Sequence, residues 1–503
     1  MGPAGVHEEN GVWRRTCRRA EFGYGFALAQ SPVWTLAQVL LATGGRLWGQ
    51  HSASVFRLVS SDSRTIEVGD LFIALKGEKF DGHAFVGEAI RQGAAGLILE
   101  KSPAESLPVS VPVVLVADTL RALGDLAHYR RNRMRHLQVL AITGSSGKTT
   151  VKEMIATILA RRHRVLKTRG NLNNLIGLPL SLLSVNEQHE FAVLEMGMNR
   201  FGEIDRMAAI ARPDIACITN VQAAHLAGVG DLAGVARAKG ELFRGMEPWT
   251  TLVVNLDDKR IRKLTNNLPH RLITFGRARG AMIRATHLRG LGQDGMSFTL
   301  RMTDDSPRRV QIAALGEHNV QNALAAAAMA RAAGISPADI IAGLLHYRPF
   351  AKRLRIQPFF AGLKLIDDSY NANPASMLAA LETVHNLRRH RRVVAVLGDM
   401  LELGGHSPGA HRFIGAKVAL LGFNYLLTVG EYAAETAAAA RRAGMSAERI
   451  RICDDKEEVK DWLVAAVRKG DLVAEDLVLV KASRGMAMET IIDGLSNTSR
   501  EQE

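Results

Sequence analysis

A glycine-rich turn at residues 144–149 constrains the fold more than any other feature of this sequence. Residues 137–142 before the turn form a short apolar run, as in a buried parallel strand. Residues 150–161 after it have apolar positions at helical spacing. In a strand, turn and helix of this order, successive backbone N–H groups and the positive helix N-terminus point at one place, where they bind an anion. The pattern therefore predicts a phosphate loop.

The residue types in this turn favour a nucleotide polyphosphate as the anion. The lysine would reach the terminal phosphates, and the threonine hydroxyl after it would bind Mg²⁺. Longer loops of this type carry a glycine at the position of Ile142, so an ordinary strand–helix turn is the alternative. We interpret the turn as an ATP site. Its predicted contacts are Gly144, Ser145, Ser146, Gly147, Lys148, Thr149 and Thr150.

The composition indicates a globular protein with anionic ligands. At 503 residues the chain has room for roughly three domains of about 150 residues each. It contains 64 Lys and Arg against 50 Asp and Glu, a net charge of +14, which favours nucleotides or nucleic acid as partners. Aromatic residues make up only 5%, and no basic run is interleaved with them, so a surface that stacks single strands is poorly supported. We therefore expect nucleotide substrates and no nucleic acid.

The cysteines and the N-terminal residues bear on location. The three cysteines are far apart and odd in number, which fits a reducing cytoplasm. Four arginines precede an uncharged stretch at 22–45, which superficially resembles a signal peptide. Polar residues interrupt that stretch, and its runs of consecutive apolar residues are too short for a membrane helix. We expect residues 1–33 to be a disordered extension of a cytoplasmic protein that does not insert stably into membranes.

Residues 34–122 are predicted to form a small α/β domain. Apolar strands at 96–99 and 111–116 follow a helical stretch at 84–92. A polar turn in this domain could bind a phosphate or the edge of a uracil, although the pattern alone favours a solvated loop. The candidate residues in the turn are Ser61, Ser63 and Arg64.

Residues 123–347 alternate strand and helix, which predicts a mostly parallel sheet with helices on both faces. Glu195 lies near the end of the strand at 191–196, and His225 follows the strand at 214–219. Since ligands gather beyond the carboxyl ends of parallel strands, Thr149, Glu195 and His225 could converge there around a divalent ion. Taken singly, Glu195 and His225 could equally be ordinary loop residues.

Two further stretches contain candidate residues that have a plain structural explanation as well. Lys239 lies in a helical segment at 235–243, where it could be a surface lysine. His318 and Asn319 open an alanine-rich helix, where they could meet a ligand or merely cap the helix.

Residues 348–503 are predicted to form a third domain that alternates strand and helix. Strands are expected at 363–366, 393–397, 425–429 and 477–480, each followed by a polar turn. The motif G-x-G-x-x-G is missing from the first of these turns, so a nicotinamide or flavin domain is disfavoured. We expect the strand ends of this domain to face the central ATP site across a cleft.

Several of these stretches together resemble the Mur ligase family. The resemblance runs in motif order from about Trp34 to Met488, and the short loop with Ile142 is normal for that family. It implies a small α/β domain that binds UDP, a central P-loop ATPase-like domain with a mostly parallel sheet, and a C-terminal Rossmann-like domain that binds further ligands. The motifs are 143–149, 195–199, 220–225, Lys239, 316–319 and 367–374.

The resemblance also implies an activity. Within the family, the motifs are most similar to enzymes that use ATP and Mg²⁺ to join D-alanyl-D-alanine to UDP-N-acetylmuramoyl-tripeptide through an acyl phosphate. This reaction belongs to peptidoglycan precursor synthesis in the cytoplasm, and we expect a monomer. The alternatives are a Mur-type ligase for a single amino acid or a folylpolyglutamate synthase-like enzyme. A more remote one is a P-loop NTPase that binds nucleic acid, which predicts salt-sensitive binding.

Site residues can be carried over from the resemblance. Lys148 and Thr149 would bind the ATP phosphates and Mg²⁺, and Glu195 and His225 would help to hold Mg²⁺. His318 and Asn319 match the adenine side. Further matches are Arg353 and Asp368 near the nucleotide from the third domain, Ser61, Ser63 and Arg64 at the UDP end, and Asn371, Asn373 and Arg484 at the peptide or dipeptide.

The same resemblance gives Lys239 a role. It matches the position where several relatives carry a carbamylated lysine, so carbamylation of Lys239 is a hypothesis here. The predicted catalytic residues are then Lys148, Lys239 and His225.

Overall fold

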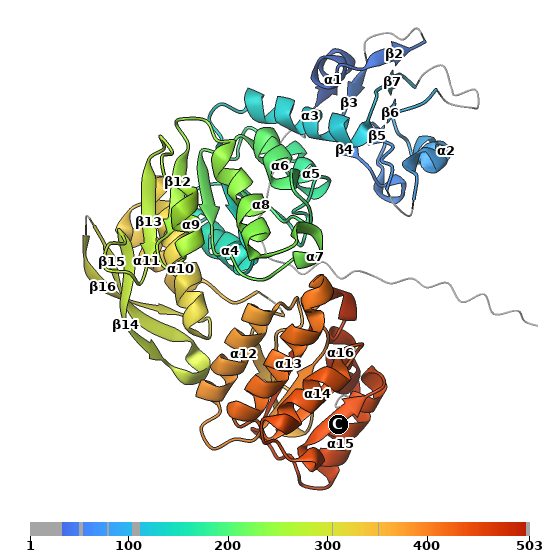
Figure 1. Cartoon of the computed structure of the whole chain (residues 1–503). Coiled ribbons are helices and arrows are strands. Elements are labelled where there is room, and N and C mark those ends of the chain that lie inside the picture. Colours follow the sequence, from blue (N-terminus) through green and yellow to red (C-terminus); the bar gives the residue numbers. More distant parts are fainter. Residues whose placement is uncertain are drawn as a thin grey trace, which may run out of the picture.

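The computed structural model has three lobes, which follow one another along the chain (Figure 1). Each lobe contains its own main β-sheet. Apart from Val33, the predicted N-terminal extension lies outside the residues that the structure describes. Within the described part of the chain, no helix is both long and apolar enough to cross a bilayer. The described residues are 33–49, 54–77, 80–102, 111–303, 305–350 and 352–498.

The first lobe is an α/β unit, as predicted. Its main strands are β2 (Arg46–Trp48), β4 (Val59–Ser60), β5 (Leu71–Ile73), β6 (Gly96–Leu99) and β7 (Val113–Leu115). They lie in the order β2-β7-β6-β5-β4, in which β2 is antiparallel to β7 and the other pairs are parallel. The remaining elements are an antiparallel pair, β1 (Trp34–Thr35) and β3 (Val55–Phe56), and the helices α1 (Leu36–Thr43) and α2 (Val86–Arg91).

A long helix, α3 (Thr119–Arg133), connects the first lobe with the second (Figure 1). The side chain of Asp118 accepts a hydrogen bond from Arg121 N and thereby caps its N-terminus. The helix packs against α1 of the first lobe and against α5 (Gly177–Leu183) and α6 (Glu203–Ala211) of the second. The predicted domain boundary between residues 122 and 123 lies inside this helix, and the domain limits stay predictions.

The second lobe contains a large sheet in which β8 lies between β11 and β10, third from the β9 edge. The order is β16-β15-β14-β13-β12-β11-β8-β10-β9. Its strands are β8 (Gln138–Thr143), β9 (Val165–Lys167), β10 (Phe191–Glu195), β11 (Ile215–Ile218), β12 (Thr251–Asn255), β13 (Leu272–Gly276), β14 (Ile283–Gly290), β15 (Met296–Met302) and β16 (Asp305–Ile312). The pairs from β9 to β14 are parallel, and β15 and β16 extend the sheet antiparallel. Because the chain leaves β8 toward both sides of the sheet, a crevice opens at the carboxyl end of β8.

Helices cover both faces of the central sheet. On one face lie α4 (Lys148–Leu159), α10 (Glu317–Ala332) and α11 (Pro337–His346), and on the other lie α3, α5, α6 and α8 (Leu232–Arg244). Residues of β8 alternate between the two cores, so the strand is buried on both faces, as parallel strands are. The short helices α7 (Leu226–Val229) and α9 (Lys259–Leu264) follow β11 and β12.

The third lobe is a Rossmann-like sheet of order β17-β18-β22-β19-β20-β21, in which only β17 is antiparallel to its neighbour. Its strands are β17 (Arg355–Pro358), β18 (Lys364–Asp367), β19 (Val393–Leu397), β20 (Tyr425–Val429), β21 (Ile450–Cys453) and β22 (Leu477–Lys481). The four strands predicted from sequence are all present, within one residue at each end. The helices are α12 (Pro374–Leu387), α13 (Ser407–Leu420) and α14 (Ala433–Arg442) on one face and α15 (Lys456–Arg468) and α16 (Glu489–Thr498) on the other (Figure 1).

Candidate active site

The phosphate loop is a tight turn between β8 and α4 that requires two glycines. Gly144 has a φ of 152° and Gly147 a φ of 80°, a region that side chains disfavour. A Cβ atom on Gly144 would lie 1.8 Å from Thr219 Oγ1, and one on Gly147 would lie 2.2 Å from Asn322 Oδ1. These glycines are therefore needed for the packing of the turn itself, in addition to the close approach of phosphate expected from the sequence.

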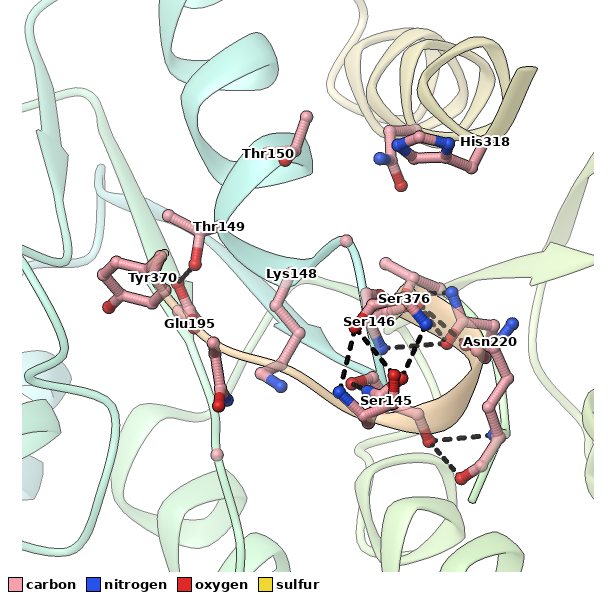
Figure 2. Close-up of a pocket in the computed structure, with 18 of the residues that line it drawn as sticks. Ser145, Ser146, Lys148, Thr149, Thr150, Glu195, Asn220, His318, Tyr370 and Ser376 are labelled. Carbon is pink, nitrogen blue, oxygen red and sulfur yellow. Dashed lines mark hydrogen bonds between the residues drawn. The ribbon is translucent and has the colours of Figure 1, made fainter. Parts of the chain in front are cut away.

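The segment that follows β11 holds the loop in place. Ser145 N donates to Asn220 O over 3.0 Å, and Ser146 N donates to Asn220 Oδ1 over 3.0 Å. Ser145 Oγ also donates to the carbonyl oxygen of Gln222 over 2.8 Å, and Figure 2 shows this network around Ser145, Ser146 and Asn220. The two serine amides are thus occupied, whereas the first N–H groups of α4 have no side-chain cap. An anion would therefore bind at the N-terminus of α4.

Lys148, the first residue of α4, has its ammonium group beside the same turn. Nζ donates to the carbonyl oxygen of Gly144 over 2.9 Å. Burial lowers the pKa of this lysine, and the nearby Arg353 lowers it further, while Glu195 and Glu402 oppose the shift. A phosphate beside Nζ would offset this desolvation further, because it adds opposite charge next to the ammonium group.

Thr149 and Glu195 lie together, as predicted for a cation site (Figure 2). Thr149 Oγ1 donates to Glu195 Oε2 over 2.9 Å, and Asn173 Nδ2 donates to the other carboxylate oxygen over 2.8 Å. Within the described ranges, no three His, Cys, Asp or Glu side chains form a metal cluster. One carboxylate and one hydroxyl nevertheless fit Mg²⁺, which is bound mainly by one or two carboxylates, water and substrate phosphates.

His225 lines the same cleft but is engaged by the third lobe. Its Nδ1 atom lies 2.6 Å from Glu402 Oε2, and hydrogen bonding to this histidine holds the pKa of Glu402 below its usual value. Of the three predicted cation ligands, Thr149 and Glu195 therefore lie together. The third, His225, has its ring against the carboxylate of Glu402, a residue that sequence analysis did not select.

Arg353 reaches from the third lobe to the start of α4. Its Nη2 atom donates to Thr149 Oγ1 over 3.0 Å, and its guanidinium lies 4.2 Å from the centroid of the Tyr370 ring. Asp368, predicted beside it, accepts a hydrogen bond from Leu354 N over 3.1 Å and pairs with Lys481 Nζ at 2.6 Å. Arg353 therefore lies at the phosphate loop, and Asp368 orders the chain that carries it.

The three predicted peptide contacts lie at the entrance of the third lobe. Asn373 caps α12, and its Nδ2 atom donates to the carbonyl oxygen of Ser145 over 3.2 Å. Asn371 Oδ1 accepts from the backbone of the following residue, and Arg484 pairs with Glu489 at 2.5 Å. All three line the cleft, and Asn373 additionally links the third lobe to the phosphate loop.

His318 and Asn319 begin α10, opposite the phosphate loop. Asn319 Nδ2 donates to the carbonyl oxygen of Leu315 over 2.7 Å and lies 3.2 Å from His318 Nε2. Burial lowers the pKa of His318 to about 4, and the charge of Lys481 contributes. The imidazole is therefore neutral at pH 7, which suits the neighbourhood of an uncharged base.

Lys239 is not the surface lysine that its sequence segment alone allowed. It lies on α8 with a side chain that is 0% exposed, and among the described residues its Nζ atom has no hydrogen-bond partner. Burial lowers its pKa well below the ordinary value, and the charge of Lys148 lowers it further. An unpaired buried ammonium is costly, so this position calls for an unprotonated or chemically altered amine.

The predicted UDP contacts lie in the first lobe, outside the main cleft. Ser63 is buried, whereas Arg64 is exposed and its guanidinium pairs with Asp62 at 2.8 Å. Ser61 lies in the turn after β4, and β4 contacts α5 of the central lobe. Residues 174–176, just before α5, line the cleft, so the turn of the first lobe lies near the cleft without forming part of it.

The cleft between the second and third lobes has a volume of about 990 Å³. Its lining includes most of the predicted residues but not Gly144, Lys239 or the UDP set. Sequence analysis had noted the polar turns that carry Lys481, Tyr370 and Glu402 without selecting these residues. Lys481 ends β22, and Tyr370 and Glu402 lie in the turns that follow β18 and β19. This placement at the carboxyl ends of strands is the signal that could have identified them.

Family models match the chain in three successive parts. They are described as the Mur ligase family catalytic domain at residues 55–131, the Mur ligase middle domain at 142–330, and the Mur ligase glutamate ligase domain at 352–484. These spans correspond to the three lobes.

Individual relatives cover nearly the whole chain. A UDP-N-acetylmuramoyl-tripeptide–D-alanyl-D-alanine ligase from Bacillus subtilis is 36% identical over 452 residues, which are 89% of this chain and 94% of the relative. The crystal structure of MurF from Acinetobacter baumannii matches with a TM-score of 0.84 at 34% identity, covering 93% of this chain and all of that one. MurF ligase from Thermotoga maritima, in complex with ADP, matches with a TM-score of 0.77 at 28% identity over 89% of this chain and 98% of that one. On the strength of this similarity along the described lobes, the chain belongs to the Mur ligase family.

Proposed function

We propose that this protein is an ATP-dependent ligase that joins D-alanyl-D-alanine to UDP-N-acetylmuramoyl-tripeptide in peptidoglycan precursor synthesis. The observation that carries the proposal is the cleft in which the phosphate loop of the second lobe faces Arg353 and Asn373 of the third. The similarity to relatives named for this reaction supports the choice of substrates.

The nucleotide is bound mainly by the second lobe. Its phosphates lie at the N-terminus of α4, where N–H groups without a side-chain cap, the helix dipole and Lys148 stabilise negative charge. Arg353 approaches from the third lobe and, through Thr149, is placed where the terminal phosphate would lie. The base lies toward His318 and Asn319. Lys148 and Arg353 together counter the charge that accumulates as phosphate is transferred.

Glu195 and Thr149 would hold the Mg²⁺ ion that accompanies ATP. When bound, this ion would supply electrostatic stabilisation of the transferring phosphate. Asn173 orients the Glu195 carboxylate, and Arg353 orients the Thr149 hydroxyl, so both oxygen atoms are held before the nucleotide binds.

The chemistry needs no nucleophilic side chain. The substrate carboxylate attacks the γ-phosphorus of ATP, ADP leaves, and an acyl phosphate forms. The amine of D-alanyl-D-alanine then attacks the acyl carbon, the amide bond forms, and phosphate leaves with loss of a proton from the nitrogen. The residues of this chain position the reactants and exclude water from the acyl phosphate, because the third lobe covers the cleft.

We also propose that Lys239 is carbamylated. Its unpaired, fully buried amine has a lowered pKa, so it is available in the neutral form that reacts with CO₂ to give a carbamate and a proton. The resulting anion would pair with the nearby Lys148 charge. Electron density at Lys239 tests this directly, and an unmodified amine there would contradict it.

The remaining assignments follow from the same proposal. The turn with Ser61, Ser63 and Arg64 binds the UDP end, and Asn371 and Arg484 meet the peptide or the incoming dipeptide. The protein acts as a monomer in the cytoplasm. Substitution of Arg64 by alanine is expected to raise the KM for the UDP precursor and to leave the KM for ATP unchanged.

Phosphate release with three acceptors tests the reaction. With UDP-N-acetylmuramoyl-tripeptide, ATP and Mg²⁺ present, release should depend on D-alanyl-D-alanine and should not occur with meso-diaminopimelate or L-glutamate, and the product mass should increase by the dipeptide. Preference for either amino acid would assign the chain to another ligase of this type. Acceptor-independent hydrolysis with salt-sensitive binding to RNA or DNA would instead indicate a nucleic-acid-binding NTPase.

A further inference from the structure

The third lobe has an edge that faces away from the cleft. Its strands β18, β22, β19, β20 and β21 are parallel, and residues at or just after the carboxyl ends of β18, β19 and β22 line the cleft. The helices α12 to α15 return the chain to the opposite edge, where short loops lead into β19, β20, β21 and β22. We call this the amino edge, which consists of residues 385–392, 417–424, 439–449 and 466–476.

The amino edge is strongly basic, whereas the cleft is not. The edge contains ten Lys and Arg and four Asp and Glu, a net charge of +6 out of +14 for the whole chain. The cleft is lined by six Lys and Arg and by six Asp and Glu. Nucleotide binding in the cleft therefore does not account for the basic character of the chain. A second, anionic partner at the amino edge would account for it.

Helix capping alone does not explain this charge. Cations interact favourably with the C-terminal end of a helix dipole, so some basic residues are expected where helices end. In the central lobe the corresponding edge pairs them with carboxylates, as Arg131 with Asp214 at 2.9 Å and Arg212 with Glu247 at 3.1 Å. At the amino edge of the third lobe, none of the ten basic side chains pairs with a carboxylate of the described residues. Their charge therefore remains available to a partner.

The loop at 388–392 lies at the centre of the amino edge, because β19 pairs with both β22 and β20. Arg388 Nη1 donates to the carbonyl oxygen of Leu421 over 3.0 Å, and Arg392 Nη1 donates to that of Asp471. These bonds connect the loop with the loops before β20 and β22. Since peptide carbonyls have no net charge, the bonds fix the guanidinium groups without neutralising them.

Two exposed aliphatic side chains flank this loop. Leu420, which is 69% exposed, precedes the residue that accepts from Arg388, and Val473, which is 54% exposed, lies two residues after the one that accepts from Arg392. Phe423 is the only Phe, Tyr or Trp of the amino edge and is buried, which disfavours stacking of single-stranded nucleic acid. Exposed aliphatic side chains among basic residues instead suit the surface of an anionic membrane.

We propose that the amino edge of the third lobe binds reversibly to anionic lipid headgroups at a membrane surface. The arginines contact the lipid phosphates, while Leu420 and Val473 enter the boundary between headgroups and acyl chains. Because the cleft lies at the other edge of the sheet, it stays open to the water phase. The contact is peripheral and goes beyond the proposed function, on which it does not depend.

Vesicle sedimentation with the full-length protein tests the basic part of the surface. The wild type should bind vesicles of phosphatidylcholine with phosphatidylglycerol, should not bind phosphatidylcholine alone, and should bind more weakly as salt is added. The edge variant replaces three exposed arginines at once: Arg389→Gln, Arg441→Gln and Arg442→Gln. It should bind on the order of 100-fold more weakly, because each charge near an anionic surface contributes about 5-fold.

A matched control separates the amino edge from net charge. The control variant replaces three exposed arginines of the second lobe: Arg271→Gln, Arg289→Gln and Arg301→Gln. It has the same net charge as the edge variant, and it should bind the anionic vesicles as the wild type does.

The apolar part is tested by Leu420→Ser together with Val473→Ser. This variant should bind anionic vesicles on the order of 10-fold more weakly, with the salt dependence of the wild type, because no charge has changed. An RNA or an acidic protein would respond to the arginines and not to these two side chains.

Three results would overturn the proposal. They are equal binding of the edge and control variants to anionic vesicles, equal binding of the wild type to neutral and anionic vesicles, and wild-type binding to single-stranded RNA that is tighter than to vesicles. The last result would assign the surface to nucleic acid. Acceptor-dependent phosphate release in solution should be the same in the wild type and the edge variant. Since vesicle binding needs no acceptor, a failure of the ligase reaction would be recognised separately.

Discussion

The two sides of the cleft are built in different ways. On the central side, the phosphate loop, Thr149 and Glu195 are held by bonds within one lobe, around the carboxyl end of β8. On the third-lobe side, each group reaches across from a loop through one or two contacts. Examples are Arg353 to Thr149 and Asn373 to Ser145.

The central side is therefore a preformed binding surface, and the third-lobe side is a second surface that completes the site. Single hydrogen bonds contribute about 1 kcal/mol each, so no one contact from the third lobe holds the cleft closed. Groups on the central side would contact the charged phosphates of the nucleotide directly. We therefore expect the loss of Lys148 on the central side to have the largest effect on activity, and substitutions on the third-lobe side to reduce it in smaller steps.

The largest effect is expected from Lys148→Ala. Loss of a charge that stabilises the transferring phosphate should lower the rate of acceptor-dependent phosphate release by about 100- to 1,000-fold. The free energy of unfolding should change little, since within the described part of the chain Nζ hydrogen-bonds only to the carbonyl oxygen of Gly144. Lys263→Ala, an exposed lysine on α9, is the matched control. Phosphate release near the wild-type rate would contradict the role of Lys148 and the distinction between the two sides.

Lys239 and Lys481 are buried lysines on opposite sides of the cleft, and their environments differ. Lys481 pairs with Asp368, whereas Lys239 lacks a hydrogen-bond partner among the described residues. Lys481→Met should lower the free energy of unfolding by about 3 kcal/mol, because it leaves a buried carboxylate unpaired. Lys239→Met should not destabilise the protein, but it should lower the ligation rate by about 10- to 100-fold.

Chemical rescue separates the explanations for Lys239. If a carbamate acts there, short carboxylic acids should restore part of the ligation rate of Lys239→Ala, which leaves space for them, and should not restore Lys148→Ala. Thermal unfolding of both variants serves as the control for folding. Destabilisation of Lys239→Met as large as that of Lys481→Met would indicate a structural lysine instead.

The central side of the cleft could be predicted from sequence because its signals are local. The glycines and Lys148 lie within one turn, and Glu195 ends a strand that the apolar run 191–196 marks clearly. Parallel strands place their carboxyl ends at one edge, so the meeting of Thr149 with Glu195 followed from topology. The strands of the third lobe were predicted within one residue at each end for the same reason.

The individual cross-lobe contacts could not be predicted from local patterns, since they depend on how two lobes pack. The family resemblance placed Arg353 near the nucleotide, but it did not give the bond to Thr149. Glu402 and His225 are far apart in sequence, and no periodicity connects them. Likewise, the sequence identified Asp368 but not its pairing with Lys481, because a lysine at the end of β22 has the same local pattern whether it is buried or exposed. The burial of Lys239 also depends on helix packing that its own segment does not encode.

Arg353 is expected to show the strongest effect on the third-lobe side. Arg353→Lys keeps the charge but loses the planar group that contacts both Thr149 and the Tyr370 ring. We expect a decrease in kcat of about 10- to 100-fold, as for loss of one hydrogen bond to a charged group, with a smaller change in the KM for ATP. Steady-state kinetics test this, with Arg449→Lys, an exposed arginine of the same lobe, as the control. An unchanged kcat would place Arg353 outside the transfer step.

Substitution of Asn373 should have the smallest effect on activity. That effect can be divided between the two contacts that the side chain makes. Its Oδ1 atom accepts from Ser376 N as the cap of α12, while Nδ2 donates to the carbonyl oxygen of Ser145. Serine caps helices as well as asparagine but is too short to span both contacts. Asn373→Ser should therefore retain stability and lower kcat a few-fold, whereas Asn373→Ala should also lower the free energy of unfolding by about 1 kcal/mol. If Asn373 instead binds the dipeptide, Asn373→Ser would raise the KM for D-alanyl-D-alanine and leave kcat unchanged.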